Sequence, residues 1–411
     1  MSIVFKIASW IYIPVLLLGL SLNAFSGNNG NLSYSNVAVQ DKPNDAKEGV
    51  GFLCDPGSLG RIKLDVTAYL LSQGIAPSLV VTKVDASNGS LTFTLNTPNA
   101  DLDTLQLKYR PEYGIRDGIV RIPDEHGELQ KLLTVSKKEI LLALLQHGRL
   151  TEFSGKSCNV NALKEQVNVR QNIVAWAEQL NWTWPDGGVA EWNEKYWHKG
   201  TPLSHVKLHL ALADAFKNQS EYAIGCYTAA KLVMVQGVLD YYRRVKHNKL
   251  LQKLVEEQLL LDHEPLVNIE PGEMWSFEQD FDSTKLTQRG KILKIQHKVA
   301  PLNFVPGDWA YIVNTDPVSA QKTGYEGSNA IYLGRNKFVD YYNDNHHAYT
   351  YQQKLDEVYQ WRNGVFSRRR DVANIQPLSV DDLERLGKSP AENGLVQSFR
   401  VFPMSFENFA D

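Results

Sequence analysis

The chain has 411 residues, of which 43% are hydrophobic and 22% charged, and its 43 basic and 46 acidic side chains give a formal net charge of -3. This is ordinary globular composition, so it excludes wholesale disorder, a collagen-like fibre and a protein with many membrane spans. The balanced charge argues against nucleic acid as a partner, and the length suggests two or three domains of about 150 residues each.

Residues 1–26 are predicted to form a secretory signal peptide. Lys6 is followed by a mostly apolar run from Ile7 to Leu20 and then by small residues, the order that such signals have. An uncleaved anchor is the alternative, and both interpretations place the rest of the chain outside the cytoplasm. Residues 27–50 are rich in Asn, Ser, Gly and Asp and are predicted to be a flexible linker. We therefore expect an exported protein, periplasmic or extracellular, with no stable membrane span in the mature chain.

Residues 51–155 are predicted to form a β-rich N-terminal module. Short runs such as 90–95 alternate apolar and polar residues between turn signals, which is typical of strands. A helix is expected over 136–147, because Ser136 can cap it and Gly148 can end it. No pattern in this region has recognisable chemistry, and we interpret it as a recognition or shielding module.

Three cysteines are present, Cys54, Cys158 and Cys226, so at most two can pair within the chain. Cys54 and Cys158 flank the strand-rich region and could staple it. Spacing does not decide this, because a disulfide needs Cα atoms within about 7 Å of each other. Cys226 is the one left over and begins an apolar helix. It is either a buried packing thiol or a nucleophile, because a helix N-terminus favours the thiolate.

Residues 156–411 are predicted to form a second domain of helices followed by strands. The expected helices cover residues 163–180, 204–216, 226–242 and 250–261, and the expected strands cover 307–313, 328–333 and 337–342. The last two strands are joined by a hairpin-like connection at residues 334–336. A cysteine at the start of a helix, followed by antiparallel strands, is the outline of a papain-like core. The predicted fold class is therefore α+β, with such a core preceded by the β-rich module.

An aromatic and glycine-rich segment, residues 182–197, lies between the first two of these helices. Trp192 and Trp197 are candidates for substrate binding, because aromatic rings can line a cleft. The alternative is a loop that plugs the core. Asn329, on the strand at 328–333, is a third candidate for substrate binding.

Acyl transfer by Cys226 needs a second group that manages its proton and orients the reaction. The polar candidates on the predicted strands and their flanks are Glu326, Ser328, Asp340, His346 and His347. For Glu326 and Asp340, the alternative is a solvated strand end. The adjacent histidines lack the spacing of metal ligands, so no metal is expected. An exposed loop pair is the simpler interpretation, although one of them could form a Cys-His dyad.

Four motifs carry a resemblance to a known family. They are the Cys226 helix with Thr228-Ala229, the sequence Val238-Leu239-Asp240 at its end, Pro306-Gly307-Asp308, and Gly327-Ser328-Asn329-Ala330-Ile331 followed by Leu333-Gly334. Over roughly residues 190–365 the sequence resembles the bacterial spore-coat type of protein-glutamine gamma-glutamyltransferase, or transglutaminase. The resemblance implies that Cys226 attacks a glutamine carboxamide of a protein or peptide, releases ammonia and passes the acyl group to a lysine or another amine. No cofactor is implied.

The family's other catalytic positions are occupied differently in this chain. Its catalytic glutamate corresponds to Ser328, a second glutamate that can replace it corresponds to Gly225, and its histidine falls at or beside Tyr341. Serine is not a general base at neutral pH without a partner of its own. Glu326 is expected on the same strand face as Ser328, and Asp340 could reach from the neighbouring strand. The predicted catalytic residues are therefore Cys226, Glu326, Asp340 and His346.

Three functions are consistent with these patterns. The leading one is an exported transglutaminase-like acyltransferase that crosslinks or deamidates. The second is a papain-like cysteine amidase or peptidase that acts on cell-wall peptide, although such enzymes place a histidine where Ser328 stands. The third is a catalytically inactive binding protein with the same fold, favoured by the missing acid and base.

Overall fold

A four-stranded sheet with two helices forms the N-terminal part of the described structure. The computed structural model describes residues 48–124, 126–185, 189–259, 294–296, 299–314, 318–322, 324–339, 348–361, 378–381 and 397–401. The sheet has the order β2-β3-β1-β6, with β1 Gly49–Leu53, β2 Val80–Asp85, β3 Ser90–Leu95 and β6 Leu150–Ser154. β1 pairs antiparallel with β3 and parallel with β6. The predicted signal peptide lies outside the described residues, and β1 begins within the predicted linker.

The helices of this part are α1, Leu59–Ser72, and α2, Lys137–Leu145. α2 confirms the helix expected there, and the Ser136 hydroxyl caps it by accepting from the Glu139 backbone N–H. α1 was not predicted from the sequence. Its buried residues Ile62, Val66 and Tyr69 recur at helical spacing, so a helical period was present among the strand-like runs. A separate hairpin of β4, Gly118–Pro123, and β5, Leu129–Thr134, completes the region.

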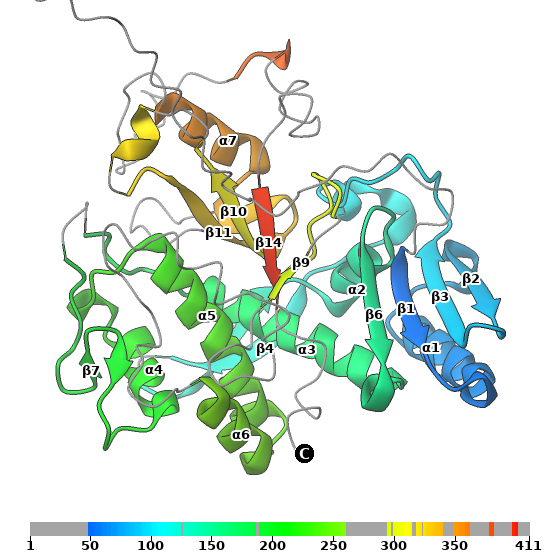
Figure 1. The fold of residues 1–411 in the computed structure, drawn as a ribbon, viewed down its shortest axis with the longest axis horizontal. Coiled ribbons are helices and arrows are strands. Elements are labelled where there is room, and N and C mark those ends of the chain that lie inside the picture. Colours follow the sequence, from blue (N-terminus) through cyan, green and yellow to red (C-terminus); the bar gives the residue numbers. More distant parts are fainter. Residues whose placement is uncertain are drawn as a thin grey trace, which may run out of the picture. The chain divides into compact units, whose positions relative to one another are not determined.

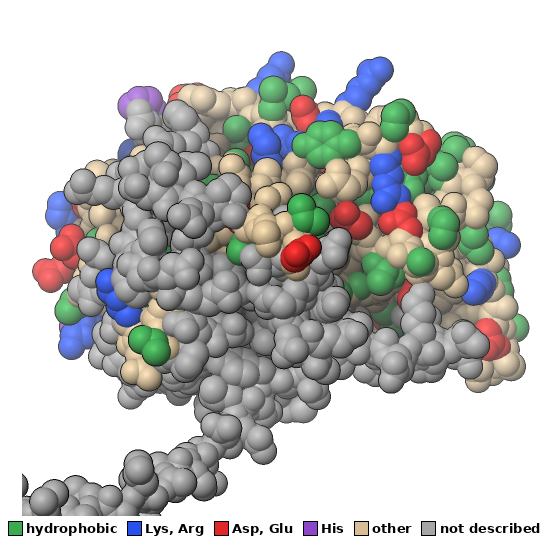
Figure 2. Space-filling model, turned by 90° about the horizontal axis from the view of Figure 1, so that it is seen from above, with side chains coloured by type: hydrophobic (Ala, Val, Ile, Leu, Met, Phe, Trp, Pro, Cys, Tyr) green, Lys and Arg blue, Asp and Glu red, His purple; other side chains and the backbone are tan. Residues whose placement is uncertain are grey.

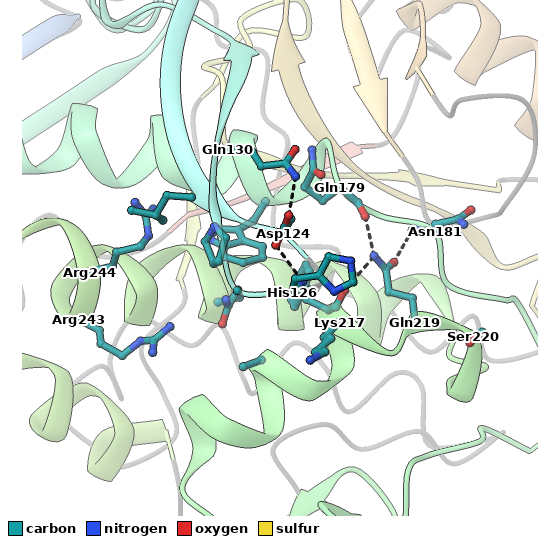
Figure 3. Close-up of a pocket in the computed structure, with 17 residues that line it drawn as sticks. Asp124, His126, Gln130, Gln179, Asn181, Lys217, Gln219, Ser220, Arg243 and Arg244 are labelled. Atoms are coloured by element: carbon teal, nitrogen blue, oxygen red, sulfur yellow. Dashed lines mark hydrogen bonds between the residues drawn. The ribbon is translucent and has the colours of Figure 1, made fainter.

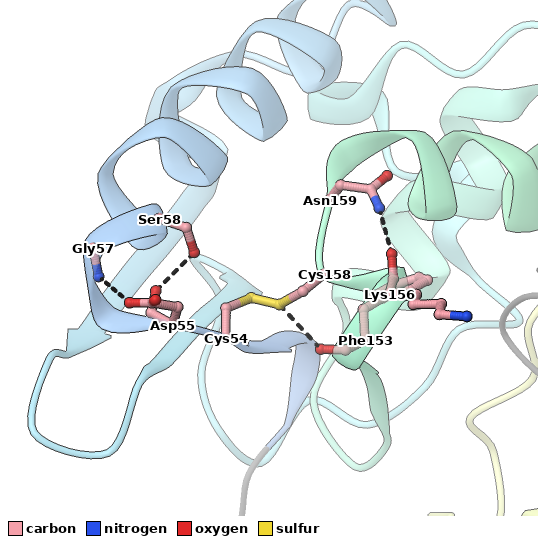
Figure 4. The surroundings of a disulfide bond; sticks show 8 residues. All are labelled: Cys54, Asp55, Gly57, Ser58, Phe153, Lys156, Cys158 and Asn159. Carbon is pink, nitrogen blue, oxygen red and sulfur yellow. Dashed lines mark hydrogen bonds between the residues drawn. A yellow bond between two sulfur atoms is a disulfide. The ribbon is translucent and has the colours of Figure 1, made fainter. Parts of the chain in front are cut away.

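A disulfide joins Cys54, just after β1, to Cys158, just before α3, which spans Val160–Ala177 (Figure 4). The two Cα atoms are 5.8 Å apart and the residues are separated by 104 positions in the sequence. This is the pairing that the cysteine count left open. It ties the four-stranded sheet to the first helix of the region that follows.

Four helices follow, α3 and then α4, Leu208–Lys217, α5, Cys226–Asp240, and α6, Lys249–Leu259. They confirm the four helices expected from the sequence. α5 is the central one: each of its residues after Cys226 is buried. At its crossing with α3, a Cβ on Gly237 would lie 2.5 Å from the Ile173 Cγ1 atom, so the close approach requires glycine. Within the described residues, no helix is both long and apolar enough to cross a membrane.

The C-terminal sheet is antiparallel and has the order β13-β12-β11-β10-β14-β9. Its strands are β9 Lys294–Gln296, β10 Trp309–Val313, β11 Gly327–Gly334, β12 Lys337–Val339, β13 Ala348–Tyr349 and β14 Gln397–Val401. β10 and β11 confirm two of the three expected strands, and β12 confirms the third as far as Val339, while its expected residues 340–342 lie outside the described residues. Arg335 and Asn336 form the predicted hairpin connection with φ values of +57° and +51°. These values fit a turn whose twist matches the flanking strands.

The two faces of this sheet pack against different helices. Trp309, Ile331 and Leu333 belong to the same hydrophobic cluster as α5. Ala310, Ile312 and Tyr332 belong to a second cluster with helix α7, Tyr351–Gln360. Figure 1 shows α5 on one side of β10 and β11 and α7 on the other. The α5-facing and α7-facing sides of β11 are therefore distinct environments, and they alternate from residue to residue.

A buried ionic cluster connects the two sheets. The Asp308 carboxylate, at the start of β10, is fully buried and accepts hydrogen bonds from Arg149, just before β6, and from Arg170 on α3, both at 2.9 Å. Burial alone would raise the pKa of Asp308, but the two guanidinium charges lower it below its usual range. The larger hydrophobic cluster likewise runs from Val50 in β1 to Val339 in β12. The domain boundary at residues 155–156 stays a prediction.

The described surface carries both signs of charge. On the face seen in Figure 2, basic and acidic side chains are interspersed, with hydrophobic side chains between them. This local mixing agrees with the near-neutral formal charge of the whole sequence.

Candidate active site

Cys226 is the first residue of α5, and Gly225 precedes it as the N-cap residue with extended backbone. With Cys54 and Cys158 joined, Cys226 is the free thiol of the chain, and it is partly exposed. The first turn of a helix presents unpaired N–H groups and partial positive charge. The thiol therefore lies beside the partial positive charge of the α5 N-terminus and where a substrate can reach it.

Asn329 of β11 faces this thiol. Its Nδ2 atom donates a hydrogen bond to the Cys226 Sγ atom at 3.2 Å, and its Oδ1 atom accepts one from the Trp309 Nε1 atom at 2.8 Å. Trp309 is fully buried, and its ring lies 5.1 Å from that of Tyr227, the next residue of α5. The site thus contains a chain of contacts that leads from the indole through the amide to the sulfur.

Ser328 lies on the other side of β11. It pairs across the sheet with Ile312, which faces α7, whereas Asn329 pairs with Tyr311. The Ser328 side chain is buried, and its hydroxyl has no hydrogen-bond partner among the residues that the structure describes. The position that corresponds to the family's catalytic glutamate is therefore turned away from Cys226.

Glu326 precedes β11 and is held in the turn there. Its Oε1 atom accepts from the Gly324 backbone N–H at 3.0 Å, and its carbonyl accepts from Asn314 N–H at 2.9 Å. Within the described part of the chain, the side-chain hydrogen bond of Cys226 goes to Asn329 and not to Glu326. The structure therefore does not bring Glu326 and Cys226 together by a hydrogen bond.

Asp340, His346 and the neighbouring Tyr341 and His347 lie outside the described residues. The catalytic roles considered for Asp340, His346 and His347 stay predictions. Among the residues that the structure describes, no group of three or more His, Cys, Asp or Glu side chains could hold a metal ion.

The two candidate tryptophans pack against each other, with ring centroids 5.0 Å apart. Trp197 is buried, and its indole N–H donates to the Ala211 carbonyl at 3.3 Å. Trp192 is only partly buried and also contacts the Tyr222 ring. Trp197 thus has the environment of a core residue, whereas Trp192 has a surface that a ligand can touch.

The aromatic-rich segment, residues 182–197, contacts the residues that precede α5 and those that precede β11. Glu191 exchanges two backbone hydrogen bonds with Ala223, and the Ile224 N–H donates to Thr183, directly before the α5 N-terminus. Trp184 packs edge-to-face on Tyr325, just before β11. Trp184 was not among the residues predicted to bind substrate, although it belongs to the aromatic-rich segment.

A cavity of about 1020 Å³ lies towards the other end of α5 (Figure 3). It is lined by Gln236 and by Arg243 and Arg244 of the π-helical turn Tyr241–Val245. Asp124 and Gln130 of the β4–β5 hairpin form its opposite wall and are hydrogen-bonded to each other. None of the described candidate residues lines this cavity, so it is separate from the Cys226 site.

More than half of the chain matches a known protein family. The protein-glutamine gamma-glutamyltransferase family matches residues 120–362, which is more than half of the chain. The chain belongs to this family. The match begins well before the region of resemblance noted in the sequence and takes in β5, α2, β6 and α3. Enzymes of this class crosslink glutamine side chains to amines.

Curated relatives agree with this assignment. A protein-glutamine gamma-glutamyltransferase of Bacillus pumilus (strain SAFR-032) is 24% identical over 225 residues, covering 53% of this chain and 77% of the relative. One from Bacillus cereus (strain AH820) is 25% identical over 233 residues, covering 54% and 70%. A transglutaminase structure from Geobacillus stearothermophilus, without its C-terminal extension, aligns with 18% identity and a TM-score of 0.35, covering 61% of this chain and 98% of that one.

Two motifs of the transglutaminase resemblance are structural in this chain. Asp308 is the centre of the buried ionic cluster described above. Asp240, the last residue of α5, is fully buried and accepts hydrogen bonds from Trp176, Asn172 and Arg244. Both carboxylates hold secondary-structure elements together, and neither contacts Cys226.

Proposed function

We propose that this transglutaminase-family protein is exported and transfers glutaminyl groups with Cys226 as the nucleophile. One observation carries the proposal: the free thiol stands at the first residue of α5 and contacts a side chain of the facing strand β11. We interpret α5 and the β10–β11 pair as the papain-like core expected from the sequence. The N-terminal sheet region, which is attached through the disulfide and the Asp308 cluster, is the proposed recognition or shielding module.

The proposed reaction has two steps. The Cys226 thiolate attacks the carboxamide carbon of a glutamine in a protein or peptide, and the C–N bond breaks as ammonia leaves with an added proton. A thioester remains on Sγ. A lysine or another amine then attacks the thioester carbon, loses a proton and releases the thiolate. Water in place of the amine would give deamidation.

Proton transfer in this reaction needs further groups. Asp340 and His346 stay our candidates because both follow β12 in the sequence, next to the strand that carries Asn329. Glu326 is the weaker candidate because it is already bonded in the turn before β11. Trp192 is our candidate for contact with the substrate.

The proposal of export rests on two features. The apolar run after Lys6 is typical of a signal peptide, and a disulfide such as Cys54–Cys158 persists in oxidising compartments rather than in the cytosol. Sequencing the N-terminus of the protein recovered from the cell envelope or medium tests it. A cytosolic protein that retains residues 1–26 and reduced Cys54 would contradict export.

Amine incorporation tests the proposed chemistry. The purified protein is incubated with a glutamine-containing protein and a labelled primary amine, and both incorporation of the amine and release of ammonia are measured. We expect both in the wild type and neither in Cys226→Ala. Ser328→Ala is the matched control, because the Ser328 hydroxyl lies on the α7-facing side of β11 and bonds to no group within the described part of the chain.

The outcomes separate the three functions considered from the sequence. Ammonia release without amine incorporation would favour a hydrolase. Absence of both in a folded wild type would favour a binding protein. Equal incorporation by the wild type and Cys226→Ala would refute the role of Cys226 as the nucleophile.

A further inference from the structure

We propose that Asn329 holds the Cys226 thiolate by donating a hydrogen bond to it, and that Trp309 fixes the orientation in which Asn329 can do so. This inference rests on the proposed role of Cys226. It gives the Cys226 sulfur a hydrogen-bond donor in a chain whose residues at the family's glutamate positions are Ser328 and Gly225.

The orientation of the Asn329 amide follows from the chemistry of its partners. An indole Nε1–H can donate but cannot accept. The atom of Asn329 that lies 2.8 Å from Trp309 must therefore be its oxygen, and the NH₂ group must point at the sulfur, 3.2 Å away. Trp309 thus allows only one of the two amide orientations. A donor faces Sγ in the orientation that remains.

Burial makes this arrangement rigid. Trp309 is fully buried between β10 and α5, and only 5% of Asn329 is exposed. The register places Trp309 opposite Ile331, so the indole and the amide lie on the same, α5-facing side of neighbouring strands. Little freedom remains for the amide to rotate, and water has little access to compete for its hydrogen bonds.

A hydrogen bond from an amide to sulfur favours the charged form of the thiol. Hydrogen bonds to an ionised group are stronger than those to a neutral one, so a donor held at Sγ lowers the free energy of the thiolate more than that of the thiol. The partial positive charge of the α5 N-terminus acts in the same direction. Asn329 therefore acts on the reacting atom itself, and Trp309 acts through Asn329 as a positioning residue.

The test is the pH dependence of alkylation of Cys226 by iodoacetamide, measured with the full-length mature protein. Among the described residues, the ionisable side chains on the surrounding elements include Tyr227 and Lys231 on α5, Tyr311 opposite Asn329, Glu326 before β11 and Glu191 in the segment paired with Ala223. Every variant used here leaves these groups in place. Shifts of the pH midpoint are therefore measured against a constant background.

Loss of the donor should raise the midpoint. We expect Asn329→Leu, which has similar size and no hydrogen-bonding group, to raise it by about one unit. Asn329→Asp keeps the acceptor for Trp309 but places a negative charge at the thiolate, so its midpoint should rise further. The aspartate variant is nearly isosteric and keeps the test open if the leucine variant folds poorly. An unchanged midpoint in folded Asn329→Leu, or in Asn329→Asp if the leucine variant does not fold, would overturn the role of Asn329.

Loss of the indole N–H should have a smaller effect of the same sign. Trp309→Phe keeps an aromatic ring beside Tyr227 but releases the Asn329 amide to present either atom to sulfur, so the midpoint should rise by less than in Asn329→Leu. Trp182→Phe is the matched control: Trp182 is also fully buried and donates a 2.8 Å hydrogen bond, to the Ala215 carbonyl. A merely structural effect would destabilise both variants and leave both midpoints unchanged.

The double variant decides whether Trp309 acts through Asn329. When Trp309→Phe is added to Asn329→Leu, we expect no further rise in the midpoint. Additive rises would overturn the positioning role, as would a wild-type midpoint in Trp309→Phe. This readout needs no transfer activity, so a thiolate that alkylates as expected without amine incorporation would refute the proposed function and leave this inference standing.

Discussion

The two ends of α5 differ in how their functional groups are satisfied. At the C-terminal end, the Asp240 carboxylate is fully buried and accepts hydrogen bonds from three side chains. At the N-terminal end, the Cys226 thiol is partly exposed and has one side-chain partner within the described structure. The hydrogen bonds of Asp240 hold the C-terminal end of α5 in the core, and we call it the closed end. The N-terminal end, which we call the open end, presents the thiol at a defined place beside Asn329.

Removing the charge at the closed end should give the largest loss of stability. In Asp240→Asn, the Arg244 guanidinium loses its buried counter-ion, and we expect the free energy of unfolding to fall by about 3–5 kcal/mol. Chemical denaturation measures it. Asp65→Asn is the control, because the Arg61–Asp65 pair is exposed and such pairs contribute about 0–1 kcal/mol. Equal losses of stability in the two variants would mean that the buried Asp240 carboxylate contributes no more to stability than the exposed Arg61–Asp65 pair.

The disulfide is the next largest contribution. It closes a loop of 104 residues between β1 and α3, the helix against which α5 packs. Replacing both Cys54 and Cys158 with serine should lower the free energy of unfolding by about 2–4 kcal/mol, chiefly because the unfolded chain gains freedom. The alkylation rate of Cys226 in the folded double variant should stay the same. A changed rate would show that the reactivity of Cys226 depends on the Cys54–Cys158 disulfide.

Glu139, which supports the hairpin at the end of β11, makes a pH-dependent contribution to the free energy of unfolding. Its Oε1 atom accepts from the Arg335 N–H at 2.6 Å, and burial raises the pKa of its carboxyl from 4.5 to about 7. A raised pKa means that the stabilising form is the protonated one, so its contribution is complete below pH 4.5 and is lost as the pH rises through 7. Glu139→Gln mimics that form.

We therefore expect Glu139→Gln to be more stable than the wild type at pH 8, by up to about 3 kcal/mol, and similar to it at pH 4. Denaturation at the two pH values measures the difference. The same difference in stability between the variant and the wild type at pH 4 and at pH 8 would show that Glu139 does not titrate in this range.

Gly237 should give the smallest of these effects. Gly237→Ala places a methyl group against Ile173 of α3, and we expect a loss of about 1–2 kcal/mol from overpacking near the closed end. Gly60→Ala is the control, because a Cβ there meets no atom within 4 Å. The control should be neutral or slightly stabilising, since alanine favours a helix over glycine. If both variants behave alike, the α3–α5 crossing is looser than the structure indicates.

Much of the fold could be predicted from local patterns. Apolar spacing located α3 to α6 and β10 to β12, and the cysteine at the start of α5 was recognised as a possible nucleophile. α1 was overlooked because its helical period lies among strand-like runs.

The site could be predicted only in part, because it depends on contacts between distant segments. Which side of β11 faces α5 is set by its pairing with β10 and by the packing of α7, and neither follows from the sequence of β11. Asn329 was therefore nominated for substrate binding rather than for contact with Cys226. Likewise, the partners of Asp308 come from Arg149 and Arg170, far away in the chain.

The most direct test of the central claim is to trap the acyl-enzyme. The protein is incubated with a short glutamine-containing peptide in the absence of an amine acceptor, quenched in acid, and analysed by mass spectrometry of its proteolytic fragments. The account predicts an adduct on Cys226 with the mass of the peptide less ammonia, which disappears when a primary amine is added. An adduct on another residue, or none while ammonia is released from the peptide, would contradict Cys226 as the nucleophile.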